Sequence, residues 1–207
     1  YYKVKLDDEN VLAELTTTER VGFHKYTFPK TDSAHIILDL TSGIYNYDGK
    51  VVWSSIRVKN DTLVTGYRQT NGWARTRLLF FAMTFSKPIQ SYGLVNKEEL
   101  IYKGFWRKFD QNKNFPEQAG NKIVGYFDFK TEDGEAILIK FALSAVSTKN
   151  AVENLIAEIP HWDFEKIKSQ AKQKWNDELS KITIESDKDR KVNFYTSMYH
   201  SFMNPII

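Results

Sequence analysis

The sequence has no cysteine among its 207 residues. This absence excludes disulfide bonds, thiolate metal sites and cysteine nucleophiles, although it leaves the cellular compartment open. The longest uninterrupted apolar run, Leu78 to Met83, is far shorter than a membrane-spanning helix requires. The net charge is only +3, and the last third of the sequence alternates Lys with Asp and Glu, so we expect neither a membrane span nor a nucleic-acid partner.

Several motifs that carry chemistry are also missing. No two glycines form a G-x-G pattern, which excludes a dinucleotide fingerprint and a phosphate-binding loop. No G-x-S-x-G nucleophile elbow occurs. The four histidines, His24, His35, His161 and His200, are scattered, and none is paired at metal-ligand spacing. We interpret them as structural residues and predict no metal site in this chain.

Carboxylates are adjacent at Asp7-Asp8-Glu9 and at Glu98-Glu99. A glycosidase needs two carboxyl groups that face one bond, about 5 to 10 Å apart. Neighbours on a strand point to opposite faces, and both clusters are expected in turns. We therefore predict no catalytic residue among them. Asp187-Lys188-Asp189 lacks the glycine and the terminal Glu of a calcium loop and is interpreted as a helix start.

Short stretches with strand character recur up to about residue 146, and several alternate polar with apolar residues. Asp48-Gly49 and Asp133-Gly134 are predicted turns between them, because glycine tolerates the backbone of a tight hairpin. The pattern predicts an antiparallel β-sandwich. The candidate strands are Tyr2–Leu6, Val11–Thr18, Gly22–Phe28, Ala34–Leu40, Val51–Val58, Thr62–Gln69, Arg77–Phe85, Ile101–Phe105, Ile123–Phe129 and Ala136–Leu143.

After Val146 the apolar residues no longer alternate with polar ones but recur at helical spacing. Ser147 or Thr148 can cap a first helix that Pro160 ends, and Asp163 can cap a second. Ser186 or Asp187 opens a third helix, which is rich in aromatic residues. We predict a sandwich domain over residues 1–146, a helical linker over 147–185 and, over 186–207, the opening of a second domain.

The last helix has apolar residues with no visible partner. Tyr195, Met198, Tyr199 and Phe202 would be exposed on an isolated chain, and such a stripe favours association or disorder. We therefore expect the tail to pack on the sandwich, on another chain or on a missing part of the protein, and we interpret the sequence as a fragment.

One segment has the residue types of a sugar site. Asn71-Gly72 marks a turn, and Trp73 directly after it can project from a sandwich edge and stack on a sugar ring. Arg68 and Asn71 could then bind hydroxyl groups. The alternative is that Trp73 fills the core, and the same core interpretation is stronger for Trp53 and Trp106.

Arg68 and Trp73 belong to a set of segments, ordered along the chain, in which the sequence resembles glycoside hydrolase family 92, the calcium-dependent exo-α-mannosidases. Lys25 stands where Arg would be expected, and Asn204–Ile207 fits the family only loosely. The segments that carry the resemblance are Ala13–Pro29, Gly66–Arg68 with Gly72–Ala74, Phe85–Pro88, Ala151–Leu155, Glu158–Phe164, Trp175-Asn176 and Phe194–His200.

The resemblance implies a two-domain enzyme in which an N-terminal β-sandwich of the supersandwich type is joined by helices to an (α/α)₆ barrel. Family members remove terminal α-mannose with inversion, using a carboxylic acid, a carboxylate base and Ca²⁺. Those groups would lie in the barrel, outside this chain, so no catalytic residue or calcium ligand is transferred. The implied partners are a mannose-containing glycan and the missing C-terminal domain. The implied location is exported: periplasmic, cell-surface or secreted.

Two other hypotheses remain. The chain could be a stand-alone, non-enzymatic carbohydrate-binding sandwich, or a sandwich used only for protein–protein contact. About 60 residues of helix ending in an exposed aromatic stripe favour the enzyme, because a binding module has no use for them.

Overall fold

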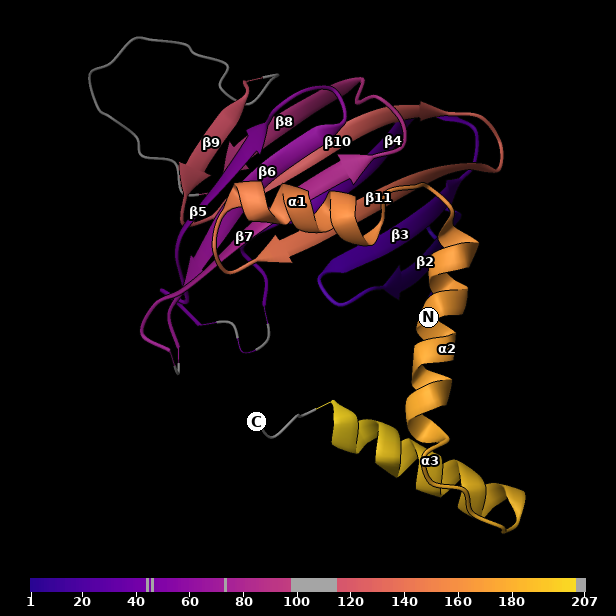
Figure 1. Cartoon of the computed structure of the whole chain (residues 1–207). Helices are drawn as coiled ribbons and strands as arrows, with labels where there is room; N and C mark the ends of the chain where they lie inside the picture. The colour runs from indigo at the N-terminus through magenta and orange to yellow at the C-terminus, as the bar shows by residue number, and fades with distance from the viewer. Residues whose placement is uncertain (44, 46, 73, 98–114, 204–207) are drawn as a thin grey trace, which may run out of the picture.

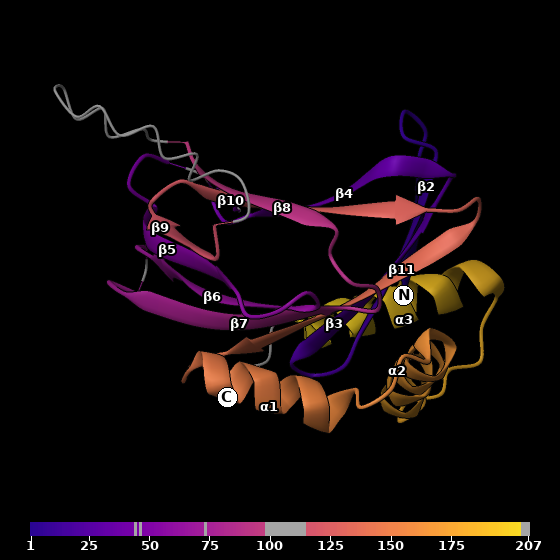
Figure 2. The ribbon, with the colours of Figure 1, turned by 90° about the horizontal axis from the view of Figure 1, so that it is seen from above.

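The computed structural model describes residues 1–43, 45, 47–72, 74–97 and 115–203. Its strands form two antiparallel sheets that face each other (Figures 1 and 2). Helices α1 and α2 lie on the outer side of the larger sheet, whereas α3 extends away from the sandwich and contacts α2. The larger sheet has the order β1-β2-β3-β11-β7-β6-β5-β9 and the smaller has the order β4-β10-β8. The sequence-based prediction of an antiparallel sandwich followed by helices is therefore confirmed.

The strands follow the predicted ranges closely. Ile101–Phe105 lies outside the described residues, and two short strands, β8 and β9, were not predicted. The full set is β1 Tyr2–Leu6, β2 Val11–Thr17, β3 Val21–Phe28, β4 Thr31–Asp39, β5 Val51–Val58, β6 Leu63–Thr70, β7 Arg77–Phe85, β8 Ser91–Asn96, β9 Glu117–Gly120, β10 Ile123–Thr131 and β11 Glu135–Ser144. The predicted turns hold Gly49 at φ +79° and Gly134 at φ +72°.

The main core fills the space between the two sheets. Alternate residues of β10, including Phe127 and Phe129, point inward and are fully buried. Phe85 of β7 meets both of these rings, at centroid distances of 5.3 and 5.2 Å. The alternation that predicted these strands therefore reflects burial of one face of each strand against the opposite sheet.

Gly66 of β6 lies where the backbones and rings of this core approach most closely. A Cβ atom at this position would lie 2.0 Å from the carbonyl oxygen of Ser55 and 2.5 Å from Cζ of Phe81. No larger side chain fits there without moving the neighbouring strand or the ring, so the glycine is a packing requirement of the core.

A second core lies on the outer face of the larger sheet. Phe23 of β3, Ala82 of β7 and Ala142 of β11 are buried there under the helices. Two helical residues that cover them, Ala151 and Ile167, are also buried. The central strands of the larger sheet are thus apolar on both faces, which explains why the sandwich needs a helical layer.

All three helices begin at predicted caps. The helices are α1 Thr148–Glu158, α2 Phe164–Leu179 and α3 Lys188–Phe202. The side chains of Ser147, Asp163 and Asp187 accept hydrogen bonds from the backbone N–H three residues later. No helix in the described part of the chain is long and apolar enough to cross a membrane.

Lys140 of β11 joins the sheet to the helices. Its side chain is buried, and its Nζ donates a hydrogen bond of 2.9 Å to the carbonyl oxygen of Ile159, the residue that caps the end of α1. The same ammonium group lies 3.9 Å from the ring centroid of Trp162. Lys140 therefore supplies a cation to a helix C-terminus whose own last turn has no basic residue.

The turn between β2 and β3 is a second attachment point. Glu158 at the end of α1 accepts hydrogen bonds from the hydroxyl of Thr18 and from the backbone N–H and Nε of Arg20. Glu19 in the same turn forms an ion pair of 3.2 Å with Lys174 of α2. Both helices are thus fastened to one hairpin turn.

We predict that Gly66→Ala destabilises the fold, because the added methyl group overlaps the Ser55 carbonyl. Overpacking of a core costs about 1–3 kcal/mol, and this overlap should place the loss at or above the upper end. Urea unfolding measures it. Gly72→Ala is the matched control, since its Cβ would meet only the Tyr47 hydroxyl at 3.7 Å. Equal stabilities for the two variants would contradict the packing argument.

We also predict a pH-dependent difference between the wild type and Lys140→Met. Burial lowers the pKa of Lys140 below its ordinary value of 10.5, so the folded protein binds this proton less tightly than the unfolded chain does. The wild type should therefore gain stability relative to the variant as the pH rises from neutral toward that value. Urea unfolding at both ends of this range tests the sign, with Lys172→Met on α2 as a control for the lost charge. An unchanged difference would refute the prediction.

Candidate functional site

Arg68 lies inside one end of the sandwich. It is on β6 two residues after Gly66 and four after Val64, so it shares their inward-facing side of the strand. Its Nε and one terminal nitrogen, Nη2, are buried and have no hydrogen-bond partner among the described residues. Burial lowers the pKa of Arg68, and the nearby Asp39 carboxylate opposes this effect. Arg68 is thus a half-buried cation at the open end of the inter-sheet space.

Asp39 ends β4 and organises the loop that follows. Its carboxylate accepts hydrogen bonds from the backbone N–H of Thr41 at 2.7 Å, the hydroxyl of Thr41 at 2.6 Å and the hydroxyl of Ser42 at 2.9 Å. Burial alone would raise the pKa of Asp39, but these hydrogen bonds lower it below its ordinary value. The carboxylate is therefore held ionised at this end of the sandwich.

Asn71 ties the β6–β7 turn to the loop that precedes β5. Its backbone N–H donates to the carbonyl of Lys50 at 2.8 Å, and its own carbonyl accepts from the Tyr47 hydroxyl at 2.8 Å. Its amide oxygen accepts from the N–H of Gly72 at 3.2 Å, and both residues lie at the start of the connection between β6 and β7. Trp73, the third predicted site residue, lies outside the described residues.

A polar cavity of about 400 Å³ adjoins Asn71. Tyr47 and Lys50, both bonded to Asn71, form part of its wall. We call it the end cavity, and its lining residues are Thr41, Tyr47, Asp48, Gly49, Lys50, Val51, Asn121 and Lys122. Sequence reasoning did not identify these residues, because they come from three separate loops with no common motif. The loop before β5 and the β6–β7 turn extend below the sheets, on the same side as α3 (Figure 1).

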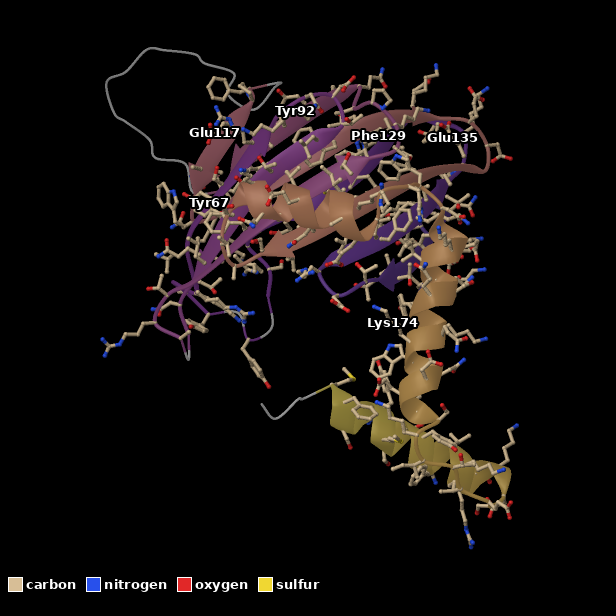
Figure 3. The ribbon with its side chains drawn as sticks, viewed as in Figure 1. Tyr67, Tyr92, Glu117, Phe129, Glu135 and Lys174 are labelled. Carbon is tan, nitrogen blue, oxygen red and sulfur yellow. The ribbon has the colours of Figure 1, made fainter. Side chains whose placement is uncertain are left out.

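The interpretation of Trp53 as a core residue is wrong. Its side chain is 46% exposed on the outer face of the larger sheet. The neighbouring strand β9 pairs only with Ser54–Arg57, so it stops short of Trp53, and the ladder is irregular between Val51 and Trp53. Tyr67, on the next strand, lies close to the start of α1 (Figure 3). Trp106 lies outside the described residues.

The histidines and carboxylates form local pairs. His35 contacts Asp128 at 2.6 Å, and the Ser91 hydroxyl donates to the other oxygen of Asp128 at 2.6 Å. The serine is bonded to the carboxylate rather than to the imidazole, so this group does not have the order of a nucleophilic triad. His24 contacts the Tyr26 hydroxyl at 3.1 Å, and burial lowers its pKa.

Of the two clusters of adjacent carboxylates, one lies in the described part of the chain. Asp7-Asp8-Glu9 lies in the turn between β1 and β2, as predicted, and Glu98-Glu99 lies outside the described residues. Across the described ranges, no group of three or more His, Asp or Glu is placed to hold a metal ion. The described residues therefore offer no carboxylate cluster for calcium.

Comparison with known proteins assigns both parts of the chain. Residues 1–144 match the glycosyl hydrolase family 92 N-terminal domain, and residues 150–207 match the glycosyl hydrolase family 92 catalytic domain. A family 92 α-mannosidase from Bacteroides thetaiotaomicron is 32% identical, with a TM-score of 0.84 over 96% of this chain and 26% of that one.

Two further proteins are similar to this chain. A family 92 inverting mannosidase from the same species is 25% identical, with a TM-score of 0.79 over 96% of this chain and 25% of that one. A protein of Arthroderma benhamiae described as an uncharacterized secreted glycosidase is 24% identical over 99% of this chain and 28% of its own length. The chain thus spans about a quarter of the length of these relatives. It belongs to glycoside hydrolase family 92.

Proposed function

We propose that this chain is the N-terminal part of an exported, inverting exo-α-mannosidase, which removes terminal α-linked mannose, as an α-1,2-mannosidase does, from mannose-containing glycans. The proposal rests on the family match: the chain matches the N-terminal domain and then the catalytic domain of one family, in that order. A 32% identical relative described as an α-mannosidase supports it. The description of another relative as secreted supports export.

The proposed role of the sandwich is to contact the sugar from one side. We assign Trp73 to stacking on a pyranose ring, because an indole offers a large apolar face and one N–H donor. Asn71, which holds the turn beside the end cavity, would bind hydroxyl groups. Arg68, whose half-buried guanidinium lies inside the same end of the sandwich, would bind sugar hydroxyl groups as well.

The acid, the base and the Ca²⁺ ligands of this proposal belong to the part of the enzyme outside residues 1–207. Calcium would contact sugar hydroxyls there, and no step is assigned to it here, because the described residues offer no ligand cluster. The division into a linker over 147–185 and a catalytic domain from 186 also stays a prediction. The match to the catalytic domain begins at residue 150.

A second candidate function is carbohydrate binding without catalysis. The observation that favours it is Trp53, which presents a partly exposed indole on a sheet face. The match of residues 150–207 to a catalytic domain favours the enzyme over this alternative.

We predict that the longer protein that contains this chain releases mannose from α-mannosides with inversion, whereas residues 1–207 alone release none. Inverting hydrolysis needs an acid and a base that face one bond. Proton NMR during hydrolysis of an aryl α-mannoside would show β-mannose as the first product, and a calcium chelator should stop the hydrolysis. Calcium-dependent mannose release by residues 1–207 would contradict the proposal, and so would α-mannose as the first product.

We further predict that Trp73→Ala in the complete enzyme lowers kcat/KM about fivefold with little change in melting temperature, since one stacked ring contributes on the order of 1 kcal/mol. Trp53→Ala is the matched control and should leave kcat/KM unchanged. If Trp73 instead fills the core, Trp73→Ala would cost about 3–5 kcal/mol of stability, and activity would fall only through unfolding.

A further inference from the structure

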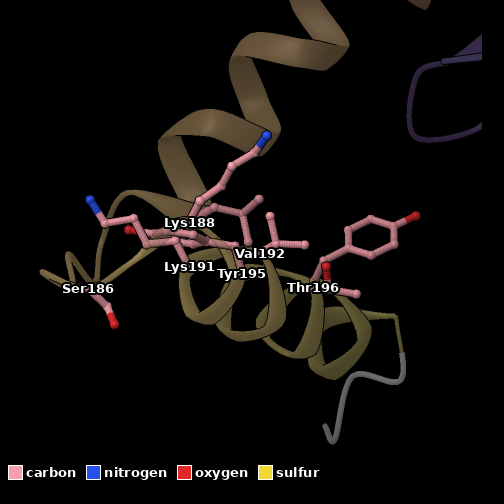
Figure 4. Close-up of a pocket in the computed structure, with 8 residues that line it drawn as sticks. Ser186, Lys188, Lys191, Val192, Tyr195 and Thr196 are labelled. Carbon is pink, nitrogen blue, oxygen red and sulfur yellow. The ribbon is translucent and has the colours of Figure 1, made fainter.

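The end cavity adjoins Asn71, one of the residues that we assign to sugar binding. A larger groove, of about 660 Å³, lies between α2 and α3 (Figure 4), and its walls come from residues 179–199, far along the chain from Asn71. The end cavity, of about 400 Å³, is instead walled in part by Tyr47 and Lys50, which both bond to Asn71. The contacts of Asn71 therefore bear on what this end of the sandwich can bind.

A tight turn in the loop before β5 holds Asn71 at both of its backbone polar groups. The turn closes through a hydrogen bond of 3.1 Å from the N–H of Lys50 to the carbonyl oxygen of Tyr47, and Gly49 within it has φ +79°. The Lys50 carbonyl oxygen accepts from the N–H of Asn71 at 2.8 Å, and the Tyr47 hydroxyl donates to the carbonyl oxygen of Asn71 at 2.8 Å. We call these two contacts to Asn71 the turn clamp.

The side chain of Asn71 has a defined orientation. Its amide oxygen accepts from the N–H of Gly72 at 3.2 Å, so the oxygen faces the backbone and the NH₂ group points away from it, because an N–H can donate only to the oxygen. Asn71 is exposed, and in the described part of the chain its NH₂ group has no hydrogen-bond partner. The side chain therefore presents two donors to a ligand.

We propose that the NH₂ group of Asn71 donates to a hydroxyl oxygen of the glycan, and that Tyr47 is a positioning residue that acts through Asn71 by means of the turn clamp. This rests on the proposed function, which assigns Asn71 to the sugar. The oxygen of a hydroxyl group has two lone pairs and accepts such a bond. A donor that is held in place before binding loses less freedom when the sugar arrives, so the clamp strengthens binding without any contact between Tyr47 and the sugar.

A double-mutant cycle in the complete enzyme, with an aryl α-mannoside as substrate, tests both parts. Tyr47→Phe keeps the ring but removes the donor of the clamp, and it should lower kcat/KM about fivefold, whereas Asn71→Ala should lower it about tenfold. The double variant should be no slower than Asn71→Ala alone, because Tyr47 acts through Asn71. Additive losses, or a fully active Tyr47→Phe variant, would overturn the positioning role.

Two further variants complete the cycle. Asn71→Asp keeps an oxygen for the N–H of Gly72 but has no donor, so it should lose activity as Asn71→Ala does; full activity would overturn the assignment of the NH₂ group. Tyr45→Phe is the matched control and should match the wild type. Tyr45 is 87% exposed in the same loop, and its contact with Lys50 is made by its backbone carbonyl oxygen.

Amide hydrogen exchange of residues 1–207, measured by NMR, tests the clamp without mannose release. In Tyr47→Phe the N–H of Asn71 should exchange severalfold faster than in the wild type, whereas Tyr45→Phe should leave it unchanged. An unchanged rate in Tyr47→Phe would overturn the clamp. If the complete wild-type enzyme released no mannose, the proposed function would fail and the sugar contact with it. If it released mannose but the losses in the cycle were additive, this inference alone would fail.

Discussion

The arrangement of the helices on the sandwich depends on one buried hydrogen bond, from Nζ of Lys140 to the carbonyl oxygen of Ile159. The last carbonyl groups of a helix have no partner within the helix, and Pro160 prevents the chain from continuing it. The sheet supplies the missing donor as a cation, which also favours the negative end of the helix dipole. Trp162 covers that cation, so the end of α1 and the approach to α2 are positioned by a strand in the centre of the larger sheet.

The same strand shows why the sandwich and its helices form one structure. In β11, Ile137 and Ile139 point into the space between the sheets, while Lys140 and Ala142 point toward the helices. Removing the helical layer would expose a face with fully buried residues, and it would leave an ammonium group without its acceptor. Glu158 adds a peripheral contact to the β2–β3 turn, where exposed ion pairs contribute little on their own. Helix α1 is therefore attached both to a central strand, through Lys140, and to a hairpin turn, through Glu158.

The sequence allowed prediction of the features that depend on local rules. The helix caps at Ser147, Asp163 and Asp187 need only one side chain and a nearby backbone N–H. The alternation of apolar and polar residues along a strand reflects the burial of one of its faces. Strand β9 has four residues and little apolar character, so no alternation of apolar and polar residues could predict it. Its short length in turn exposes Trp53, which local reasoning placed in the core. The end cavity joins residues near 41, 47–51 and 121 that meet only after folding, so no spacing could reveal it.

We expect the sandwich and α1 to form one cooperative unit through the Lys140 contact, whereas α3 has no comparable buried contact in the described part of the chain. Native-state hydrogen exchange of residues 1–207 tests this most directly, because it reports the free energy of opening of each element. Amides in the middle of α1 should be protected as strongly as those of β11, while those of α3 should exchange orders of magnitude faster. Exchange of α1 at the rate of α3, with β11 still protected, would contradict it.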